Sequence, residues 1–223
     1  MDGNRRFTRQ LGMEEGMGHL KGKDKLEEML GWCLELGIKV LTVYAFSTEN
    51  INRDPEQVEK LMKIFEDNFC KAADDERVHR YKVRIKALGA LEKLPEGVRE
   101  SIRDAEEKTK DYGEYHFNIA IAYGGREELL QAIQRVAKDV KDGILDLEDI
   151  DEKAVADRLY TSDLPDPDLI LRTSGEERVS NFLIWQLAYS ELYFTDVYWP
   201  GFRKIDFLRA IRSYQNRHRR WGK

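Results

Sequence analysis

Arg172 and Arg178 bracket a Thr-Ser-Gly turn, and residues of these types could bind an oxyanion. A guanidinium group is a planar fork that donates two parallel hydrogen bonds to phosphate or carboxylate oxygens. Backbone N–H groups of a small-residue turn could point at the same spot and add further donors. Together these donors suit a ligand with several acceptor oxygens, such as a diphosphate. Taken alone, the stretch also fits a surface turn with solvated charges.

Three other segments carry small, polar or guanidinium groups. One lies near the start of the chain, at residues 2–6, and the other two, at residues 47–53 and 124–126, each follow an apolar run. The arginine turn itself follows the apolar run at residues 169–171. In an open parallel sheet, ligands bind beyond the carboxyl ends of the strands. We therefore predict that the four segments meet at one phosphate-binding rim. A helix beginning near Arg126 would add the positive end of its dipole to that rim.

Branched and aromatic apolar residues predict strands at residues 38–46, 82–88, 115–123 and 168–171. Helical periodicity predicts helices at residues 20–36, 54–73, 96–110, 126–141, 152–159, 181–189 and 206–217. Gly37 ends the first of these helices, and Asp54 and Pro55 are the N-cap and first residue of the second. Strands alternating with helices predict an α/β fold. We expect a single domain over residues 1–223, with a largely parallel central sheet flanked by helices.

Five short blocks of this chain resemble the cis-prenyltransferases, the isoprenyl diphosphate synthases of the undecaprenyl or dehydrodolichyl diphosphate type. The blocks are Met-Asp-Gly-Asn-Arg-Arg at 1–6, Gly-His at 18–19, Tyr-Ala-Phe-Ser-Thr-Glu-Asn at 44–50, Tyr-Gly-Gly-Arg at 123–126 and the stretch 172–191. They are in family order and span nearly the whole chain, so they are far more specific than a lone glycine-rich turn. The resemblance implies an enzyme that elongates an allylic diphosphate with isopentenyl diphosphate. Such an enzyme releases pyrophosphate and forms a cis double bond.

The resemblance also implies the roles of individual residues. Asp2 matches an aspartate that organises Mg²⁺ on the allylic diphosphate, and Asn50 matches a residue at the reacting carbons, so both are predicted to be catalytic. Substrate binding is implied for Gly3, Asn4, Arg5, Arg6, His19, Arg172, Arg178 and Ser180. Ser47 and Arg53 are also predicted to bind substrate, because they stand in the polar segment that follows the first predicted strand. Glu191 matches a carboxylate that helps to bind the metal, and pairing with an arginine is the alternative for this residue.

Magnesium is the cofactor that this reaction implies. Breaking the allylic C–O bond puts negative charge on a diphosphate, and a cation with fixed donors stabilises that charge. Mg²⁺ prefers one or two carboxylates with phosphate oxygens and water, which suits Asp2 and Glu191. The resemblance further implies a hydrophobic tunnel between the sheet and two helices. The apolar faces at residues 20–36 and 54–73 could line it, and ordinary core packing explains them equally well.

Two departures from the family pattern leave an alternative function open. Glu15 stands where many members have a phosphate-binding arginine. Members also have an apolar strand before the first block, and nothing precedes Met1 here, so we expect that strand to be missing. The alternative is a non-catalytic partner subunit of a heteromeric cis-prenyltransferase. No Asp-Asp-x-x-Asp motif occurs, which excludes the all-helical trans-type synthases.

The composition limits the remaining classes of function. A chain of 223 residues suits one domain with a sizeable core. Two isolated cysteines predict reduced thiols and a cytoplasmic location, and no stretch is long and apolar enough to span a membrane. The formal net charge of -5 gives no reason to expect a nucleic-acid partner.

The basic tail at residues 217–223 is the exception to this charge balance. Alone it would suggest nucleic acid or anionic lipid. In the family an Arg-x-Gly ending reaches the active site of a neighbouring subunit, and residues 220–222 match it, so we predict a homodimer. Residues 181–194 are a candidate dimer surface, with core burial as the alternative. We also predict peripheral membrane contact for product release.

Overall fold

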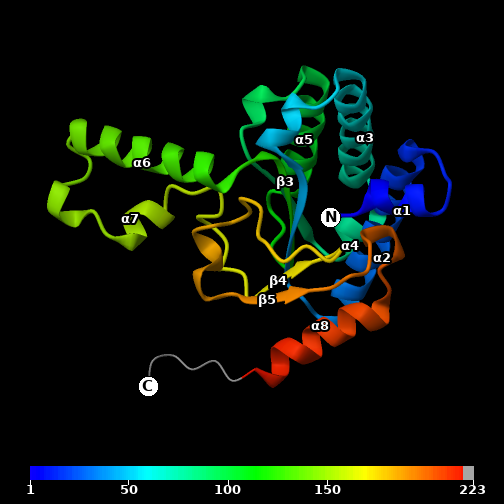
Figure 1. Cartoon of the computed structure of the whole chain (residues 1–223). Coiled ribbons are helices and arrows are strands. Elements are labelled where there is room, and N and C mark those ends of the chain that lie inside the picture. Colours follow the sequence, from blue (N-terminus) through cyan, green and yellow to red (C-terminus); the bar gives the residue numbers. More distant parts are fainter. Residues whose placement is uncertain (218–223) are drawn as a thin grey trace. The chain divides into compact units, whose positions relative to one another are not determined.

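The structure, a computed structural model, describes residues 1–217 apart from the side chain of Glu15. The chain divides into two compact units, and Figure 1 labels helices and strands of both. Unit 1 comprises Met1–Gly37, Asp166–Ser180 and the segment from Gln186 onward, and unit 2 comprises Ile38–Pro165 and Asn181–Trp185. The N-terminal segment and the arginine turn therefore belong to the same unit.

Unit 2 is built on a parallel sheet with the strand order β1-β3-β2. Its strands are β1 (Val40–Ser47), β2 (Val83–Leu88) and β3 (Tyr115–Tyr123). β3 pairs in parallel with both neighbours, and its last six residues are buried. A strand of a parallel sheet that is covered on both faces is apolar along its length, which explains the continuous apolar run in the sequence. The predicted α/β fold with a parallel central sheet is confirmed.

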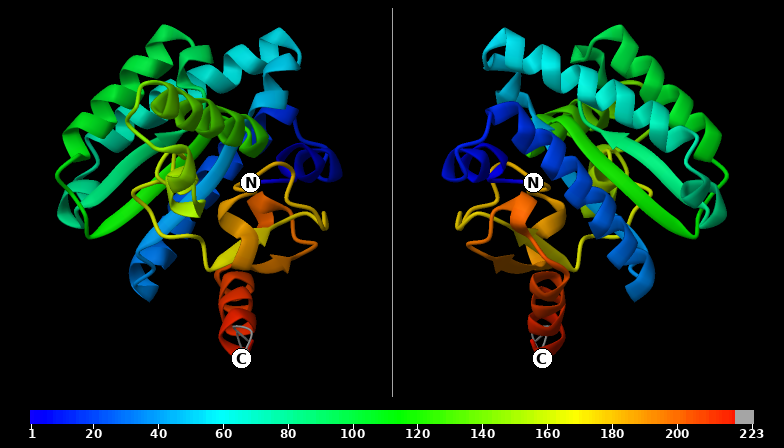
Figure 2. Two further views of the ribbon diagram at one scale, coloured as in Figure 1. Left: turned by 90° about the vertical axis from the view of Figure 1, so that its left-hand side faces the viewer. Right: turned by 90° about the vertical axis from the view of Figure 1, so that its right-hand side faces the viewer.

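Helices flank this sheet as predicted. The helices of unit 2 are α3 (Pro55–Ala73), α4 (Glu76–Arg80), α5 (Glu96–Thr109), α6 (Gly125–Lys141) and α7 (Glu152–Ala156), of which α4 and α5 contact β2. α3 and α5 pack side by side (Figure 2), and Leu61, Phe69 and Ile102 are buried on them. The side chain of Asp54 accepts a hydrogen bond of 3.2 Å from the N–H of Gln57. This aspartate therefore caps α3, as its position before proline predicts.

As far as Arg217, unit 1 combines three α-helices with a parallel pair of strands. They are α1 (Asn4–Gln10), α2 (Glu15–Leu36), β4 (Leu169–Arg172), β5 (Glu191–Phe194) and α8 (Lys204–Asn216). The rings of Trp199 and Phe202 stack with their centroids 6.0 Å apart, and Trp32 of α2 lies 6.5 Å from Phe202. The indole N–H of Trp199 donates to the carbonyl oxygen of Gly22 at 2.7 Å. These contacts join α2 to the segment that follows β5.

The prediction of a helix at residues 181–189 is wrong. Only Gln186–Tyr189 is helical there, as a 3₁₀ turn. Ser180, Asn181 and Leu183 have φ values of 48°, 62° and 45°, and a left-handed backbone cannot continue a right-handed helix. The helix predicted at residues 152–159 is also shorter, because α7 ends at Ala156. The short elements α1, α4 and β5 were not predicted.

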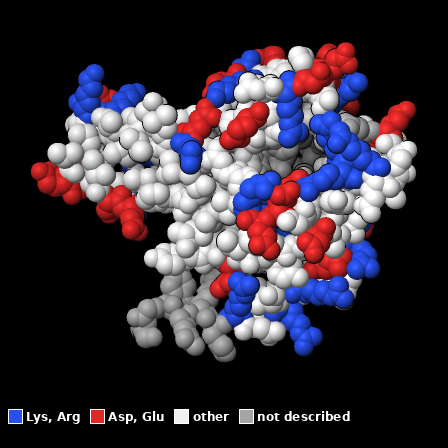
Figure 3. All heavy atoms as spheres, in the orientation of Figure 1, with Lys and Arg blue, Asp and Glu red and all other residues white. Residues whose placement is uncertain are grey.

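The remaining predictions concern the surface, the C-terminal end, the tunnel and the domain boundary. Among residues 1–217, no helix has the length and apolar composition needed to cross a membrane. Acidic and basic side chains are interspersed on the face shown in Figure 3. The Arg-x-Gly ending at residues 220–222 lies outside the described residues. The hydrophobic tunnel and the single-domain boundary stay predictions.

Candidate active site

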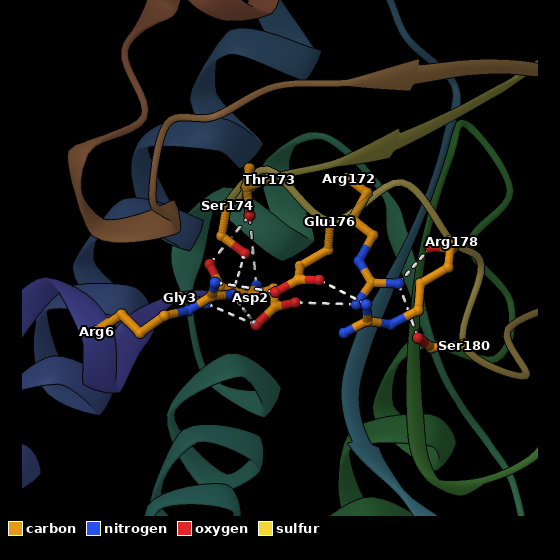
Figure 4. Close-up of polar contacts among 9 residues, drawn as sticks. All are labelled: Asp2, Gly3, Arg6, Arg172, Thr173, Ser174, Glu176, Arg178 and Ser180. Atoms are coloured by element: carbon orange, nitrogen blue, oxygen red, sulfur yellow. Dashed lines mark hydrogen bonds and ion pairs between the residues drawn. The ribbon is translucent and has the colours of Figure 1, made fainter.

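The start of the chain is held between the end of β4 and the segment after β5. The hydroxyl of Thr173 donates to the carbonyl oxygen of Asp2 at 3.0 Å (Figure 4), and the N–H of Trp199 donates to the same oxygen at 3.0 Å. Gly3 has a φ of 93°, and a Cβ at this position would lie 2.7 Å from Cδ1 of Tyr198. Glycine is required there because it alone combines that backbone conformation with so close a contact.

Five charged side chains form a ring at this place (Figure 4), called the charged ring below, in which guanidinium and carboxylate groups alternate except where Arg178 meets Arg172. Arg172 pairs with Asp2 at 3.0 Å, and Asp2 lies 3.6 Å from Arg6. Glu176 bridges Arg6, at 3.0 Å, and Arg178, at 2.5 Å. Arg172 closes the ring by donating to the backbone carbonyl of Arg178. Three guanidinium groups and two carboxylates give the ring a net charge of +1 when all are ionised.

Neutral groups hold two of these arginines in place. Arg172 donates to Oγ of Ser180 at 2.7 Å, and its side chain is only 17% exposed. Arg6 donates to Oγ of Ser174 at 2.7 Å and lies 5.5 Å from the centre of the Tyr198 ring. The structure therefore brings the predicted residue Ser180 into direct contact with Arg172.

The environment keeps Asp2 ionised. Burial acts to raise the pKa of Asp2, but the hydrogen bond and positive charge of Arg172 outweigh it and hold that pKa below its usual value. The N–H of Gly3 also donates to Oδ1 of Asp2 at 2.8 Å. At neutral pH the residue is a carboxylate with cationic and amide donors around it.

The backbone of the Thr-Ser-Gly turn does not offer its N–H groups to a ligand as predicted. Ser174 and Gly175 have φ values of 76° and 74°. The N–H of Ser174 donates to the carbonyl of Val197 at 2.9 Å, and that of Gly175 donates to the carbonyl of Thr195 at 2.9 Å. The sheet-like pairing with the segment after β5 takes these donors. The arginine side chains around the turn, and not these two backbone N–H groups, are therefore the candidate donors for a ligand.

Residues 4–6 lie on α1, which packs closely on α2. A Cβ at Gly18 would lie 2.4 Å from the backbone oxygen of Asn4, and a Cβ at Gly22 would lie 2.5 Å from its Oδ1. That Oδ1 is buried and accepts no hydrogen bond within residues 1–217. Asn4 thus faces α2, and Gly18, which precedes His19, is explained by this packing. Arg5 and His19 are half-buried, and their predicted roles stay predictions.

The other two predicted segments meet each other in unit 2. Asn50 lies in a 3₁₀ turn (Thr48–Asn52), and its side-chain amide donates to Oγ of Ser47 at 2.6 Å. A Cβ at Gly124 would lie 2.7 Å from Oγ1 of Thr48, so residues 47–53, which include Arg53, approach residues 124–126. Convergence of all four segments on one rim stays a prediction.

Asn181 caps the helix that was predicted to attract phosphate. Its backbone oxygen accepts from the N–H of Gly125 at 2.8 Å, and its Oδ1 accepts from the N–H of Arg126 at 2.9 Å. Its amide also donates to Glu49 at 3.1 Å. α6 does begin where predicted, at Gly125, but these two N–H groups are already bonded to protein oxygens.

A polar network holds the connection between β3 and α6. The hydroxyl of Tyr123 donates to Oε2 of Glu128 at 2.6 Å, and Oε1 of Glu128 accepts from the N–H of Tyr160 at 2.8 Å. The hydroxyl of Tyr44 donates to the carbonyl of Tyr123 at 3.0 Å, and burial raises the pKa of Tyr44 to about 12. Burial raises the pKa of Tyr123 as well, so Tyr44 and Tyr123 are both neutral hydrogen-bond donors at physiological pH.

Glu191 lies at the opposite end of the strand pair from Asp2. It begins β5 opposite Leu169, whereas Arg172 is paired with Phe194, three residues further on and about 10 Å along the strand. Its carboxylate forms an ion pair with Arg217. The structure thus contains the arginine pairing that was the alternative for Glu191, and a metal role stays a prediction.

The donor set around Asp2 fits Mg²⁺ only in company with a diphosphate. Among residues 1–217, no group of three or more His, Cys, Asp or Glu side chains could hold a metal ion. Asp2 supplies one carboxylate, and the guanidinium groups beside it attract phosphate. A magnesium site built from one carboxylate, phosphate oxygens and water matches this arrangement, whereas an all-protein cage does not.

Sequence patterns missed several residues that contact the predicted segments within each unit. Glu176, Ser174 and Tyr198 contact Arg6, and Asn181 caps α6. The first two stand inside the arginine turn, which is the one signal that could have identified them.

Comparison with known proteins gives concordant matches over the whole chain. A family model described as putative undecaprenyl diphosphate synthase matches residues 1–222. The chain is 57% identical over 222 residues to the tritrans,polycis-undecaprenyl-diphosphate synthase (geranylgeranyl-diphosphate specific) of Thermoplasma volcanium, covering 100% of this chain and 86% of that protein. Its identity to the synthase of the same name from Methanopyrus kandleri is 56% over 223 residues, covering 100% and 82%.

Two solved structures resemble this one. Lavandulyl diphosphate synthase from Lavandula x intermedia, in complex with dimethylallyl diphosphate, has a TM-score of 0.93 and 35% identity, covering 100% of this chain and 95% of that chain. A probable undecaprenyl diphosphate synthase from Campylobacter jejuni has a TM-score of 0.78 and 34% identity, covering 91% and 92%.

Proposed function

The chain belongs to the undecaprenyl diphosphate synthase family of cis-prenyltransferases, and we propose that it elongates geranylgeranyl diphosphate. It is a transferase that condenses isopentenyl diphosphate with an allylic diphosphate to give a polyprenyl diphosphate and pyrophosphate. The choice of primer, and of undecaprenyl diphosphate as product, rests on the names of the relatives that are 57% and 56% identical. The observation that carries the proposal is this similarity over the whole length of the chain.

The charged ring is the proposed site for the two diphosphates. A guanidinium group has five N–H donors, so a diphosphate can accept from those that the carboxylates leave unused. We assign the allylic diphosphate to Gly3, Asn4, Arg5 and Arg6, and isopentenyl diphosphate to Arg172, Arg178 and Ser180. Support comes from the ion pair of Arg172 with Asp2 and from the net positive charge of the ring.

Asp2 is the proposed ligand of Mg²⁺, which it would hold together with oxygens of the allylic diphosphate. When bound there, the ion would offset the negative charge that develops on the leaving diphosphate. Arg172 and the N–H of Gly3 keep the Asp2 carboxylate ionised and oriented. Glu191 is also proposed as a metal ligand, but from the other end of the strand pair it does not reach the ion at Asp2 of the same chain, and it would have to exchange Arg217 for a metal.

The remaining site residues are proposed to handle the reacting carbons and the leaving group. Asn50 would act at those carbons, with Ser47 fixing the orientation of its amide through their 2.6 Å hydrogen bond. His19 would lie near the leaving diphosphate, and Arg53 would assist in substrate binding.

A homodimer in the cytoplasm, with peripheral membrane contact for product release, is the proposed working form. Exposed apolar side chains gather in one stretch of unit 2, where Leu130 and Ile133 share a face of α6 and Ile144 and Leu147 follow it. Such a face suits a second copy of the chain. Light scattering of the purified protein tests the dimer, and a monomer at micromolar concentration would contradict it.

One incubation tests the proposed reaction and primer. The purified protein is given labelled isopentenyl diphosphate, Mg²⁺ and either geranylgeranyl or farnesyl diphosphate, and the products are sized by chromatography. We expect labelled polyprenyl diphosphate, formed faster with geranylgeranyl diphosphate. Equal or faster elongation of farnesyl diphosphate would refute the proposal that geranylgeranyl diphosphate is the primer. If no primer is elongated unless a catalytic homologue is added, the chain is a partner subunit.

A further inference from the structure

Glu176 is the member of the charged ring for which the family motif supplies no role here. Its Oε1 accepts from Arg6 at 3.0 Å, and its Oε2 accepts from Arg178 at 2.5 Å. Arg6 lies on α1 and Arg178 on the turn after β4, so one carboxylate joins arginines from two distant parts of the sequence (Figure 4). The Glu176 side chain is itself only 25% exposed.

The conformation of Arg178 depends on this contact. Its side chain is 61% exposed, and within residues 1–217 its guanidinium forms one ion pair, with Glu176. Its backbone is fixed separately, because its carbonyl accepts from Arg172. A long exposed side chain without a partner samples many rotamers, and a ligand that binds it must first order it.

The chemistry of the carboxylate explains why a glutamate serves both arginines. An ionised carboxylate only accepts hydrogen bonds, so each of its oxygens can face a different guanidinium group. A glutamine has one acceptor oxygen, and its NH₂ group would face the donors of the other arginine. A shared carboxylate also offsets the repulsion between two cations held close together.

We propose that Glu176 is a positioning residue, which holds Arg6 and Arg178 side by side in the orientation that receives the two diphosphates. This inference rests on the proposed function, which gives Arg6 to the allylic diphosphate and Arg178 to isopentenyl diphosphate. The glutamate orders both guanidinium forks before either substrate arrives. Ordering in advance strengthens binding because it lowers the entropic cost of binding.

The variant Glu176→Gln tests this proposal by direct binding. Calorimetry measures the dissociation constant of isopentenyl diphosphate in the presence of Mg²⁺ and without an allylic primer, so no turnover is needed. We expect that constant to rise about threefold to tenfold, the effect of leaving one arginine side chain to be ordered on binding. The matched control is Glu177→Gln, which removes the same charge from the neighbouring exposed glutamate and should bind as the wild type does.

A double variant tests whether Glu176 acts through Arg178. Arg178→Ala should weaken binding by itself, and adding Glu176→Gln to it should cost nothing more. Unchanged or tighter binding by Glu176→Gln, an equal loss in Glu177→Gln, or a full further loss in the Arg178→Ala background would overturn the proposal. If the wild-type protein binds isopentenyl diphosphate but elongates no primer, the proposed function fails while this test is still decisive. Thermal melting of each variant checks that it is folded.

Discussion

Replacing Gly3 by alanine tests how tightly the start of the chain must be held for the site to work. At a φ of 93°, a side chain costs about 1–2 kcal/mol of backbone strain. The new Cβ would also lie 2.7 Å from Cδ1 of Tyr198 and 3.0 Å from Cβ of Ser174. Carbon atoms in contact prefer about 3.5–4.0 Å, so the segment has to move by about 1 Å, and overpacking of this kind costs a further ~1–3 kcal/mol. We therefore expect a loss of about 2–5 kcal/mol in the free energy of unfolding.

The same displacement should reduce catalysis, because Asp2 moves with Gly3 and its position relative to Arg172 changes. A shift of about 1 Å in a positioned group costs on the order of 100-fold in rate, and we expect that loss in kcat/KM. Gly12→Ala is the matched control, since Gly12 has a φ of 63° but no heavy atom lies within 4 Å of its added Cβ. It should lose about 1–2 kcal/mol and keep its activity. Urea unfolding and steady-state kinetics give both quantities. Wild-type kcat/KM in Gly3→Ala, or an equal kinetic loss in Gly12→Ala, would refute the reasoning.

Three further predictions follow from the contacts of Asp2 and of α1. Asp2→Asn should abolish turnover while the fold survives, and retained turnover would show that the metal role is misassigned. Because the folded-state pKa of Asp2 is lowered, its pairing with Arg172 stabilises the protein above the unfolded pKa of about 4 and ceases to do so as the pH falls through the folded pKa. Asp2→Asn should therefore show a shallower loss of stability in acid, measured by urea unfolding from pH 6 to pH 3, and an unchanged slope would contradict this. Gly18→Ala should cost about 1–3 kcal/mol through its clash with the α1 backbone, whereas Gly31→Ala on the same helix has no close neighbour and should stabilise by up to about 1 kcal/mol. Thermal melting distinguishes them, and equal effects of the two alanines would show that α1 does not pack as described.

Local chemistry in the sequence determined most of the regular elements. Asp54 before Pro55 marks the start of α3, and Gly37, with a φ of 68°, ends α2 where predicted. These signals act within one turn of the chain, so they need no knowledge of the rest of the fold. The same local reasoning failed at residues 181–189, where apolar spacing predicted a helix. Asn181 instead takes a left-handed conformation and caps α6, a contact with residues more than fifty positions away.

The ordered motif blocks of the sequence determined the family and named most of the residues that gather around Asp2. What only the tertiary structure decided is which partner each group has. Ser174 and Gly175 give their N–H groups to the strand-like segment after β5, Glu191 pairs with Arg217, and Glu176 joins Arg6 to Arg178. Residue types establish which hydrogen bonds and charges are available, whereas their pairing depends on which distant segments the packed backbone brings within about 3 Å of each other.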